Sequence, residues 1–419
     1  MNAPDLSELT RVAARIGLLS FGGPAAQIAL MHKELVEDRN WLDEPTFLRA
    51  LSLCMLLPGP EAMQLATYVG WRLHGVRGGL IAGGLFVLPG ALIIAALALG
   101  YATYGQLPLV QALFVGIKAT VIVIVLQALL KVARKALTSR AAWMIAALSF
   151  IAIFAFGLPF PLIIACAALW GYATARATPV QASPLPAATT RQGLVRTIAI
   201  WGSLWLSPLA LLALTGHSFL TQLGLFFAKL AVVTFGGAYA VLAYMTQTVV
   251  ADYGWITTAQ MIDALGLAET TPGPLILVTE FVALLAGFYQ GGWGMAFAAG
   301  ALALWVTFIP CFLWIFLAGP LLDQIATRPR LGAALTAITA AVVGVILNLS
   351  LWFALHVAFA DVNQTAIGPL SLPVPDLATL QPVALALMGL AALLLLRLDR
   401  GLPATLAITA ACAGFISVI

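Results

Sequence analysis

The sequence predicts an all-α polytopic membrane protein, with about 13 membrane segments, some of them re-entrant, arranged as two inverted-topology repeats. Three observations carry this prediction: the composition, a series of apolar runs, and an internal repeat whose loops exchange charge. Hydrophobic residues make up 62% of the 419 residues and charged residues 9%, against roughly 45–50% and about 25% in soluble globular chains. So few charges cannot cover a water-facing surface, which excludes soluble enzymes, nucleic-acid binders and disulfide scaffolds.

Apolar runs of about 20 residues are long enough to cross the hydrocarbon core as a helix. The longest uninterrupted runs are 79–101, 108–130, 197–215, 293–318 and 330–355. Shorter runs, or runs interrupted by Gly and Pro, are 10–32, 47–71, 141–157, 160–175, 221–248, 259–288, 381–397 and 403–419. The polar start MNAPDLSELT lacks the basic region of a cleaved signal peptide. We therefore expect the first apolar segment to be retained, the N-terminus to be cytoplasmic, and the chain to lie in a bacterial inner membrane.

An internal repeat runs through the chain at a constant offset of 214 residues. Ser20-Phe21-Gly22-Gly23 recurs as Thr234-Phe235-Gly236-Gly237, and Pro58-Gly59-Pro60 recurs as Pro272-Gly273-Pro274. Further pairs at this offset are Arg15 with Lys229 and Trp41 with Trp255. Beyond a short insertion the offset becomes 221, at Pro89 with Pro310 and Pro108 with Pro329. Agreement at so many Gly, Pro and Trp positions indicates a duplication of 10–135 into 224–356.

The repeat divides the chain into four parts. These are a first repeat (1–135), connecting helices and a Pro/Ala/Thr-rich linker (136–223, with the linker at 176–196), a second repeat (224–356), and an outside loop with two C-terminal helices (357–419). The three helices expected between the repeats supply the odd number of crossings that an inversion requires.

Cations in the loops orient the two repeats. Arg77 lies in the loop after the first Pro-Gly-Pro motif, whereas the matching loop at 288–294 is neutral. The neutral loop at 103–108 is matched in the second repeat by a loop that contains Arg328. Lys and Arg collect in cytoplasmic loops, so loops that exchange their cations predict opposite orientations of the two repeats.

The short segments around the motifs have two possible arrangements. Residues 33–49 carry Lys33, Arg39 and Arg49, while the matching 247–263 carry no cation. If the segments cross the membrane fully, the cationic loop lies outside; if each segment enters and returns, it lies inside. Re-entrant hairpins obey the charge rule in both repeats and are the preferred interpretation. Full crossing is the alternative, because an amphipathic stretch with several acids weakens the rule.

The Phe-Gly-Gly and Pro-Gly-Pro motifs place four helix breaks inside apolar runs. Broken backbone at membrane depth is tolerated only where it is buried in protein or lines a wet cavity, and matched breaks in two inverted halves indicate a transport site. Close helix packing at small residues is the structural alternative. A helix that restarts after a break offers free amide hydrogens and the positive end of its dipole, which favour an anion.

We therefore predict a substrate site built from the backbone of the breaks, nearby polar side chains and one cation per repeat. Arg15 and Lys229 each lie about 7.5 Å along a helix from a break, and snorkelling to the membrane interface is their alternative role. The predicted substrate-binding residues are Arg15, Ser20, Gly22, Gly23, Gln27, Gly59, Gln64, Lys229, Thr234, Gly236, Gly237, Thr270, Thr271 and Gly273. The acids within membrane segments, predicted to couple transport to an ion, are Glu61, Glu269 and Glu280.

Signatures of ATP-driven or enzymatic chemistry are missing: the sequence has no P-loop, HExxH or GxSxG motif. No catalytic residue, cofactor, metal or nucleic-acid partner is predicted, and the expected partners are the substrate and the lipid bilayer. The remaining energy source is an ion gradient or the membrane voltage. Expelling a dianion from a cell that is negative inside gains about 4.6 kcal/mol per 100 mV, so voltage alone can sustain efflux.

Several segments together resemble the chromate ion transporter family in its long, two-repeat form. They are SFGGP (20–24), RNWLDE (39–44), LPGPEAMQLATYVGW (57–71), LFVLPG (85–90) and LAETTPGP (267–274). The resemblance covers both halves of the chain and implies a secondary transporter that exports chromate from the bacterial cytoplasm and confers chromate resistance, with sulfate as a related tetrahedral dianion. It also implies about 13 segments in halves of opposite topology, in agreement with the charge pattern. Ala238 replaces the proline of the first Phe-Gly-Gly-Pro motif, which predicts a softer second break.

Two alternatives to chromate export remain open at this stage. A sulfate or other oxyanion importer belongs to the same class of protein. An intramembrane enzyme acting through Glu269 and Asp263 belongs to another class, but it lacks a nucleophile or metal ligands. The oligomeric state is also open, with a dimer as one option.

Overall fold

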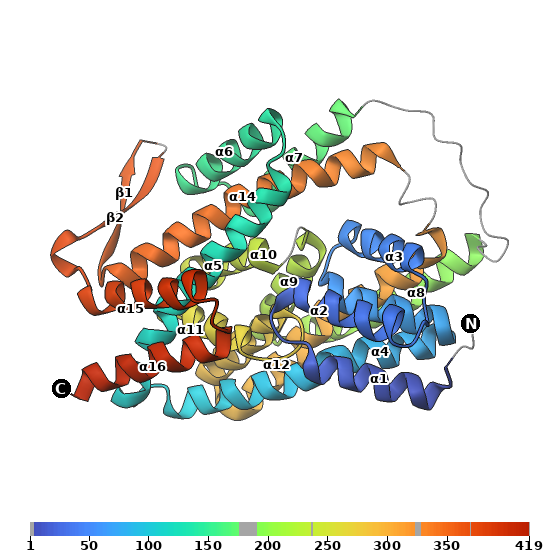
Figure 1. Ribbon diagram of the computed structural model, residues 1–419, viewed down its shortest axis with the longest axis horizontal. Helices are drawn as coiled ribbons and strands as arrows, with labels where there is room; N and C mark the ends of the chain where they lie inside the picture. Colours follow the sequence, from blue (N-terminus) through green and yellow to red (C-terminus); the bar gives the residue numbers. More distant parts are fainter. Residues whose placement is uncertain (1–3, 176–190, 236–237, 323–327, 369, 419) are drawn as a thin grey trace. The chain divides into compact units, whose positions relative to one another are not determined.

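The computed structural model describes residues 4–175, 191–235, 238–322, 328–368 and 370–418, and it is helical over most of them (Figure 1). Five described helical stretches are long and apolar enough to cross a membrane: α4 (Glu61–Tyr104), α5 (Pro108–Ala136), α8 (Arg191–Leu214), the run Leu275–Leu321, and α14 (Pro329–Ala358). Shorter apolar helices follow the remaining predicted segments. The helical membrane protein that the composition predicts is therefore the observed fold class.

The chain forms two compact units. Unit 1 comprises Met1–Ala98, Ala175–Ala238 and Thr271–Gly332. Its elements are α1 (Leu6–Leu19), α2 (Gly23–His32), η1 (Lys33–Glu37), α3 (Glu44–Leu56), most of α4, α8, α9 (Ser218–Val233), η3 (Leu275–Leu277), α12 (Val278–Ala318) and η4 (Gly319–Leu321). Helices α8 and α9 pack against α12. Two reciprocal bonds join α8 to α12: Trp205 Nε1 donates to the Val306 oxygen and Trp305 Nε1 to the Leu204 oxygen, both at 2.9 Å.

Helices α4 and α12 each reverse direction within their length. In α4 the backbone leaves the helical region at His74 and Gly75, and a Cβ on Gly70 would lie only 2.2 Å from the Gly78 oxygen. Residues at this separation in a straight helix are about 12 Å apart, so the chain turns back at Gly75. In α12 the reversal falls at Gly291 and Gly292. Both long helices are therefore antiparallel hairpins.

The first Phe-Gly-Gly segment is also a hairpin. Leu9 and Val12 of α1 line the same small apolar cavity as Met31 and Leu35, which follow the break. In a continuous helix Val12 and Leu35 would lie roughly 34 Å apart. The chain therefore turns back between α1 and α2, which is the form that the re-entrant interpretation requires.

The start of α3 carries a negative charge that nearby cations influence. The pKa of Asp43, which precedes α3, is lowered first by a hydrogen bond with Thr46 and also by the positive charges of Arg49 and Arg72. Arg72 lies at the far end of the first arm of α4.

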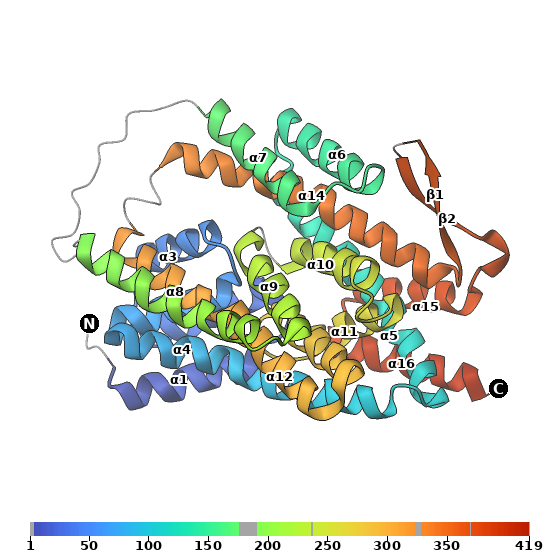
Figure 2. The same ribbon diagram turned by 180° about the vertical axis from the view of Figure 1, so that it is seen from behind.

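Unit 2 comprises Leu99–Thr174, Tyr239–Thr270 and Ala333–Ile419. Its elements are the end of α4, α5, α6 (Arg140–Phe154), α7 (Phe160–Thr174), α10 (Ala238–Thr246), η2 (Gln247–Asp252), α11 (Thr258–Glu269), α14, β1 (Val362–Ile367), β2 (Leu370–Pro375), η5 (Leu377–Thr379), α15 (Pro382–Ala392), η6 (Leu393–Arg397) and α16 (Leu402–Val418). Helix α5 packs against α11, α15 and α16, and α6 and α7 lie along α14 (Figure 2). Small residues permit this packing: a Cβ on Gly344 of α14 would lie 2.1 Å from the Ala146 oxygen of α6.

Two local features differ from the sequence-based expectations. The predicted outside loop after α14 contains an antiparallel hairpin of β1 and β2, because the alternating VNQTAI and the Pro-containing LSLPVP favour extended backbone over helix. The predicted linker 176–196 lies outside the described residues as far as 190, and its last part is already the start of α8.

Candidate site at four helix breaks

The four predicted breaks come together in unit 1 through a reciprocal pair of backbone bonds. The Gly59 amide donates to the Thr234 oxygen at 2.9 Å, and the Gly273 amide donates to the Ser20 oxygen at 2.9 Å. These bonds are equivalent, because both pairs are related by the 214-residue repeat offset. Each Pro-Gly-Pro turn thus holds the Phe-Gly-Gly turn of the other repeat. Such an exchange is characteristic of two-fold related surfaces.

Glycine is required at both donor positions. Gly59 has φ 120° and Gly273 has φ 89°, a region that L side chains rarely adopt. A Cβ on Gly59 would also lie 2.8 Å from Gln64 Nε2 and 2.9 Å from Cys311 Sγ. The two glycines therefore allow the tight turns from which their amides reach the opposite repeat.

A small cavity lies where the four breaks meet. It is lined by residues from all four: Pro24, Gln27, Pro60, Glu61, Ala62, Thr234, Ala238, Pro274, Leu275 and Ile276. Its volume is about 10 Å³, which is on the order of the space that one water molecule needs. A tetrahedral oxyanion is larger, so its binding requires the walls of the cavity to separate.

Four helix starts border this cavity. Helix α2 begins at Gly23, α4 at Glu61, α10 at Ala238 and η3 at Leu275. In α4 the Gln64 amide donates back to the Pro60 oxygen, and the amides of Glu61 and Ala62 lie in the turn before it, where a helix has no acceptor of its own. The positive dipole ends of four helix starts therefore border one cavity, and this arrangement favours an anion.

Gln27 is the polar side chain most deeply buried at the cavity. It is 1% exposed, and its Nε2 donates to the Gly273 oxygen at 2.7 Å and to the Ser20 oxygen at 3.2 Å. Its Oε1 has no hydrogen-bond partner among the described residues. Gln27 thus ties one break of each repeat together and leaves an acceptor oxygen unused.

The other predicted polar residues at the breaks bond locally. The hydroxyl groups of Ser20 and Thr234 donate to the Ile16 and Leu230 oxygens, each at 2.6 Å. Gln64 is fully buried, and its Nε2 donates to the Pro58 oxygen at 2.7 Å. Gly22 forms the turn before α2 with φ 82°. These groups shape the breaks, and among them only Thr234 lines the cavity.

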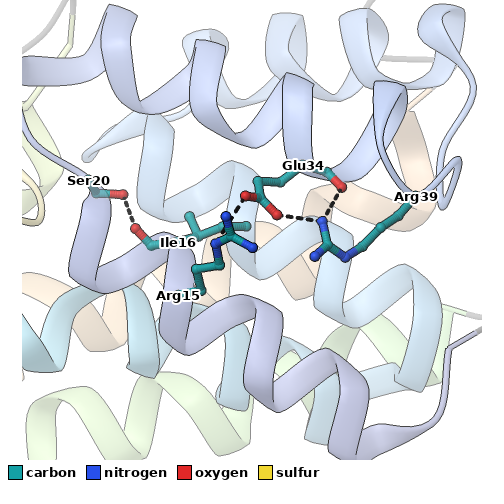
Figure 3. Close-up of polar contacts among 5 residues, drawn as sticks. All are labelled: Arg15, Ile16, Ser20, Glu34 and Arg39. Atoms are coloured by element: carbon teal, nitrogen blue, oxygen red, sulfur yellow. Dashed lines mark hydrogen bonds and ion pairs between the residues drawn. The ribbon is translucent and has the colours of Figure 1, made fainter.

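The two predicted cations lie elsewhere. Arg15 is exposed on α1, and its Nε lies 3.3 Å from Glu34 Oε1. Figure 3 shows Glu34 between the guanidinium groups of Arg15 and Arg39, which also pairs with it. Lys229 is exposed on α9 at the equivalent position. Neither cation is among the described residues that line the cavity.

The remaining predicted residues are dispersed. Glu61 lines the cavity, whereas Glu280 is buried within α12 and Glu269 accepts a 2.5 Å bond from the Tyr239 hydroxyl in unit 2. Thr270 ends α11 and donates to the Leu267 oxygen, and Thr271 is buried at the start of the second Pro-Gly-Pro turn. Gly236 and Gly237 lie outside the described residues.

A buried charged cluster in unit 2 was not predicted as a site. Lys118 Nζ on α5 lies 3.5 Å from Asp263 Oδ2 on α11, and the Tyr101 hydroxyl donates to the same oxygen at 2.7 Å. The available signal was a lone cation and a lone acid, each in the middle of an apolar run, since intramembrane charges of opposite sign usually pair. Sequence alone left Lys118 without a partner.

Comparison with known proteins identifies the family. The model of the family described as Chromate transporter matches residues 7–172 and 221–416, one part for each repeat. A probable chromate transport protein of Synechococcus elongatus is 31% identical over 361 residues, which are 82% of this chain and 83% of the relative. The chromate transport proteins of Cupriavidus metallidurans and Pseudomonas aeruginosa are 31% and 33% identical, over 81% and 79% of this chain and 80% and 77% of their own lengths. No solved structure matches the chain. With its apolar helices and two repeats, the chain belongs to the chromate transporter family and is a multi-pass membrane protein.

Proposed function

We propose that the protein exports chromate from the bacterial cytoplasm across the inner membrane and so confers chromate resistance. The substrate site is the cavity at the four helix breaks. Binding there uses the first backbone amides and the positive dipole ends of the restarting helices, with Gln27, Glu61 and Thr234 in the cavity wall. The observation that carries this proposal is the convergence of four helix starts on one cavity in unit 1.

Transport requires that this cavity open alternately to the two sides. At about 10 Å³ it is too small for the substrate, so the reciprocal bonds of Gly59 and Gly273 hold a closed arrangement of the breaks. The site would open when a Phe-Gly-Gly turn moves away from the Pro-Gly-Pro turn of the other repeat that holds it. Because the two bonds are equivalent, breaking one while keeping the other provides two related open forms, which is the general principle of alternating access in repeat transporters.

The direction of transport follows from the electrical gradient. A cell that is negative inside expels an anion with a gain of about 2.3 kcal/mol per charge per 100 mV. Export of chromate therefore needs no ATP, whereas import of sulfate against the same voltage needs a coupled cation. Glu61, as an acid at the cavity, is the group through which a proton would drive such import.

Flux measurements in liposomes test the proposed function. Radioactive chromate is loaded inside, a potential is imposed, and efflux is compared for the wild type, Gly273→Ala and Gly84→Ala. We expect voltage-dependent efflux that Gly273→Ala abolishes, because Gly273 has φ 89°. Gly84→Ala is the control, since a Cβ there meets nothing within 4 Å. Wild-type protein that accumulates sulfate with a pH gradient, and does not move chromate, would instead identify the importer.

A further inference from the structure

We propose that the cavity binds the oxyanion in its singly protonated form, with Gln27 Oε1 accepting a hydrogen bond from the hydroxyl group of the anion. This inference rests on the proposed function and refines the dianion expected from the sequence. It names the chemical class that the site selects: tetrahedral oxyanions that carry one proton near neutral pH.

Gln27 lines the cavity and carries a buried acceptor oxygen that is not used. Its Nε2 donates to two backbone oxygens, of Ser20 and Gly273. The reverse orientation would place Oε1 against both of these acceptors, so the bonds fix which end of the amide is which. Oε1 is consequently left as a buried acceptor without a partner among the described residues. Leaving such a group unsatisfied is costly, and a ligand that supplies a donor removes the cost.

Glu61 is a second side chain of the cavity wall that carries acceptor oxygens. It is the only ionisable side chain among the described residues that line the cavity, and an ionised carboxylate is an acceptor only. A fully ionised dianion presents only acceptor oxygens, so it can donate a hydrogen bond neither to Glu61 nor to Gln27 Oε1. A hydroxyl on the anion turns one of these contacts into a hydrogen bond, while the remaining oxygens accept from the helix-start amides.

A site that needs a protonated substrate distinguishes chromate from sulfate, although the two dianions have the same shape and charge. Hydrogen chromate exchanges its proton near neutral pH, so a substantial share of chromate carries it under cellular conditions. Hydrogen sulfate is a strong acid, so sulfate in the same range has no proton to donate. Sites that require a substrate hydroxyl discriminate strongly against analogues without one, and we expect sulfate to bind at least about 100-fold more weakly than chromate.

The protonated form also changes the charge moved per chromate. A single charge balances about a tenfold gradient at 60 mV, whereas a dianion balances about a hundredfold gradient at the same voltage. The equilibrium ratio of chromate across a membrane at a fixed potential therefore counts the charges, provided that pH is equal on both sides.

The experiment uses full-length protein in liposomes at equal pH, with an imposed potential of about 60 mV and protein-free liposomes as the leak control. We expect a chromate ratio of about ten, with sulfate in excess causing little competition and inorganic phosphate, which carries a proton, competing clearly. Gln27→Met should lower the preference for chromate over sulfate by about tenfold or more. The control is Gln222→Met, on the exposed face of α9, which should leave that preference unchanged.

The outcomes distinguish this proposal from the proposed function. A chromate ratio near one hundred, or sulfate competing as well as chromate in the wild type, overturns the protonated substrate while leaving chromate transport intact. A ratio near ten that becomes one hundred in Glu61→Gln assigns the proton to Glu61 instead and also overturns it. If Gln27→Met fails to fold, the wild-type ratio and sulfate competition still decide. If the wild type moves no chromate, the proposed function itself fails.

Discussion

At the scale of single residues, two buried carboxylates of the described chain, Glu34 and Asp263, are paired with cations. The side chain of Glu34 is 4% exposed and lies between Arg15 and Arg39. Asp263, 3% exposed, is held by Lys118 and by the Tyr101 hydroxyl. A buried carboxylate without partners is very costly, so these cations are needed first of all to hold the fold. The position of Arg15 five residues before a break does not by itself make it a substrate contact.

Neutralisation of Arg15 tests whether this cation stabilises the fold or contacts the substrate. In Arg15→Gln, Glu34 keeps Arg39 as a partner, and the Arg15 side chain is 59% exposed. We therefore expect a loss of about 1 kcal/mol or less in stability and an unchanged affinity for chromate, measured by calorimetry in detergent. Glu34→Gln, which leaves two neighbouring guanidinium groups without their carboxylate, should destabilise more. If Arg15→Gln instead weakens chromate binding by 1.5–3 kcal/mol, the arginine contacts the anion directly.

The pair of Lys118 and Asp263 predicts a double-mutant result. Lys118→Met leaves a buried, uncompensated carboxylate, so we expect a loss of about 3–5 kcal/mol in the free energy of unfolding. Replacing both residues in Lys118→Met/Asp263→Leu removes the unpaired charge and should restore most of that stability. Thermal unfolding of the purified variants, at equal detergent concentration, measures both effects. Equal losses in the single and double variants would show that the pair does not interact energetically.

At the scale of elements, the hairpin is the recurring unit. The arms of α4 turn at Gly75, those of α12 at Gly291 and Gly292, and α1 and α2 turn at the first Phe-Gly-Gly motif. In each hairpin, at least one of the two arms is shorter than the roughly 20 residues that a complete crossing needs. The turns of α4 and α12 are exposed, whereas the Phe-Gly-Gly turn between α1 and α2 is one of the breaks at the cavity, which Pro24 and Gln27 line.

The element boundaries were predictable where helix chemistry sets them. Pro-Gly-Pro and Phe-Gly-Gly cannot continue a helix, so the ends of α1, α3 and α9 fall at the expected motifs. The pairing of those turns was not predictable, because the Gly59 bond to Thr234 joins residues from different repeats and depends on tertiary packing. Gln27 was found as a polar residue near a break, but its two acceptors and its unused oxygen follow only from the folded backbone.

The close packing of α4 on the second Pro-Gly-Pro turn predicts that a larger side chain at the contact destabilises the protein. A Cβ on Gly90 would lie 2.2 Å from the Pro272 oxygen, so Gly90→Ala must displace the second Pro-Gly-Pro turn. We expect it to destabilise the protein by about 1–3 kcal/mol and to lower chromate flux in liposomes. Gly84→Ala, in the same arm of α4, meets no neighbour within 4 Å and should be tolerated. Equal flux and equal thermal stability in the two variants would contradict the close contact.

At the scale of the whole molecule, the equivalent bonds of Gly59 and Gly273 relate the two repeats by an approximate two-fold exchange. A two-fold axis in the membrane plane inverts one repeat relative to the other, whereas an axis along the membrane normal leaves both in the same orientation. The backbone bonds are compatible with either axis. The loop charges decide between them, because a parallel arrangement would put the cationic turn at Arg77 and the neutral turn at Gln290 on the same side.

Cysteine labelling at matched turns tests this orientation. Arg77 and Gln290 flank the equivalent reversals of α4 and α12, and Arg328 precedes α14; all three are exposed. Single cysteines are introduced there in a background without Cys54, Cys166, Cys311 and Cys412. Because Lys and Arg collect on the cytoplasmic side, Arg77→Cys and Arg328→Cys should resist a membrane-impermeant thiol reagent in intact cells and react after permeabilisation, while Gln290→Cys should react from outside. Labelling of Arg77→Cys and Gln290→Cys from the same side would establish parallel repeats, and the exchange of cations between matched loops would then need another cause.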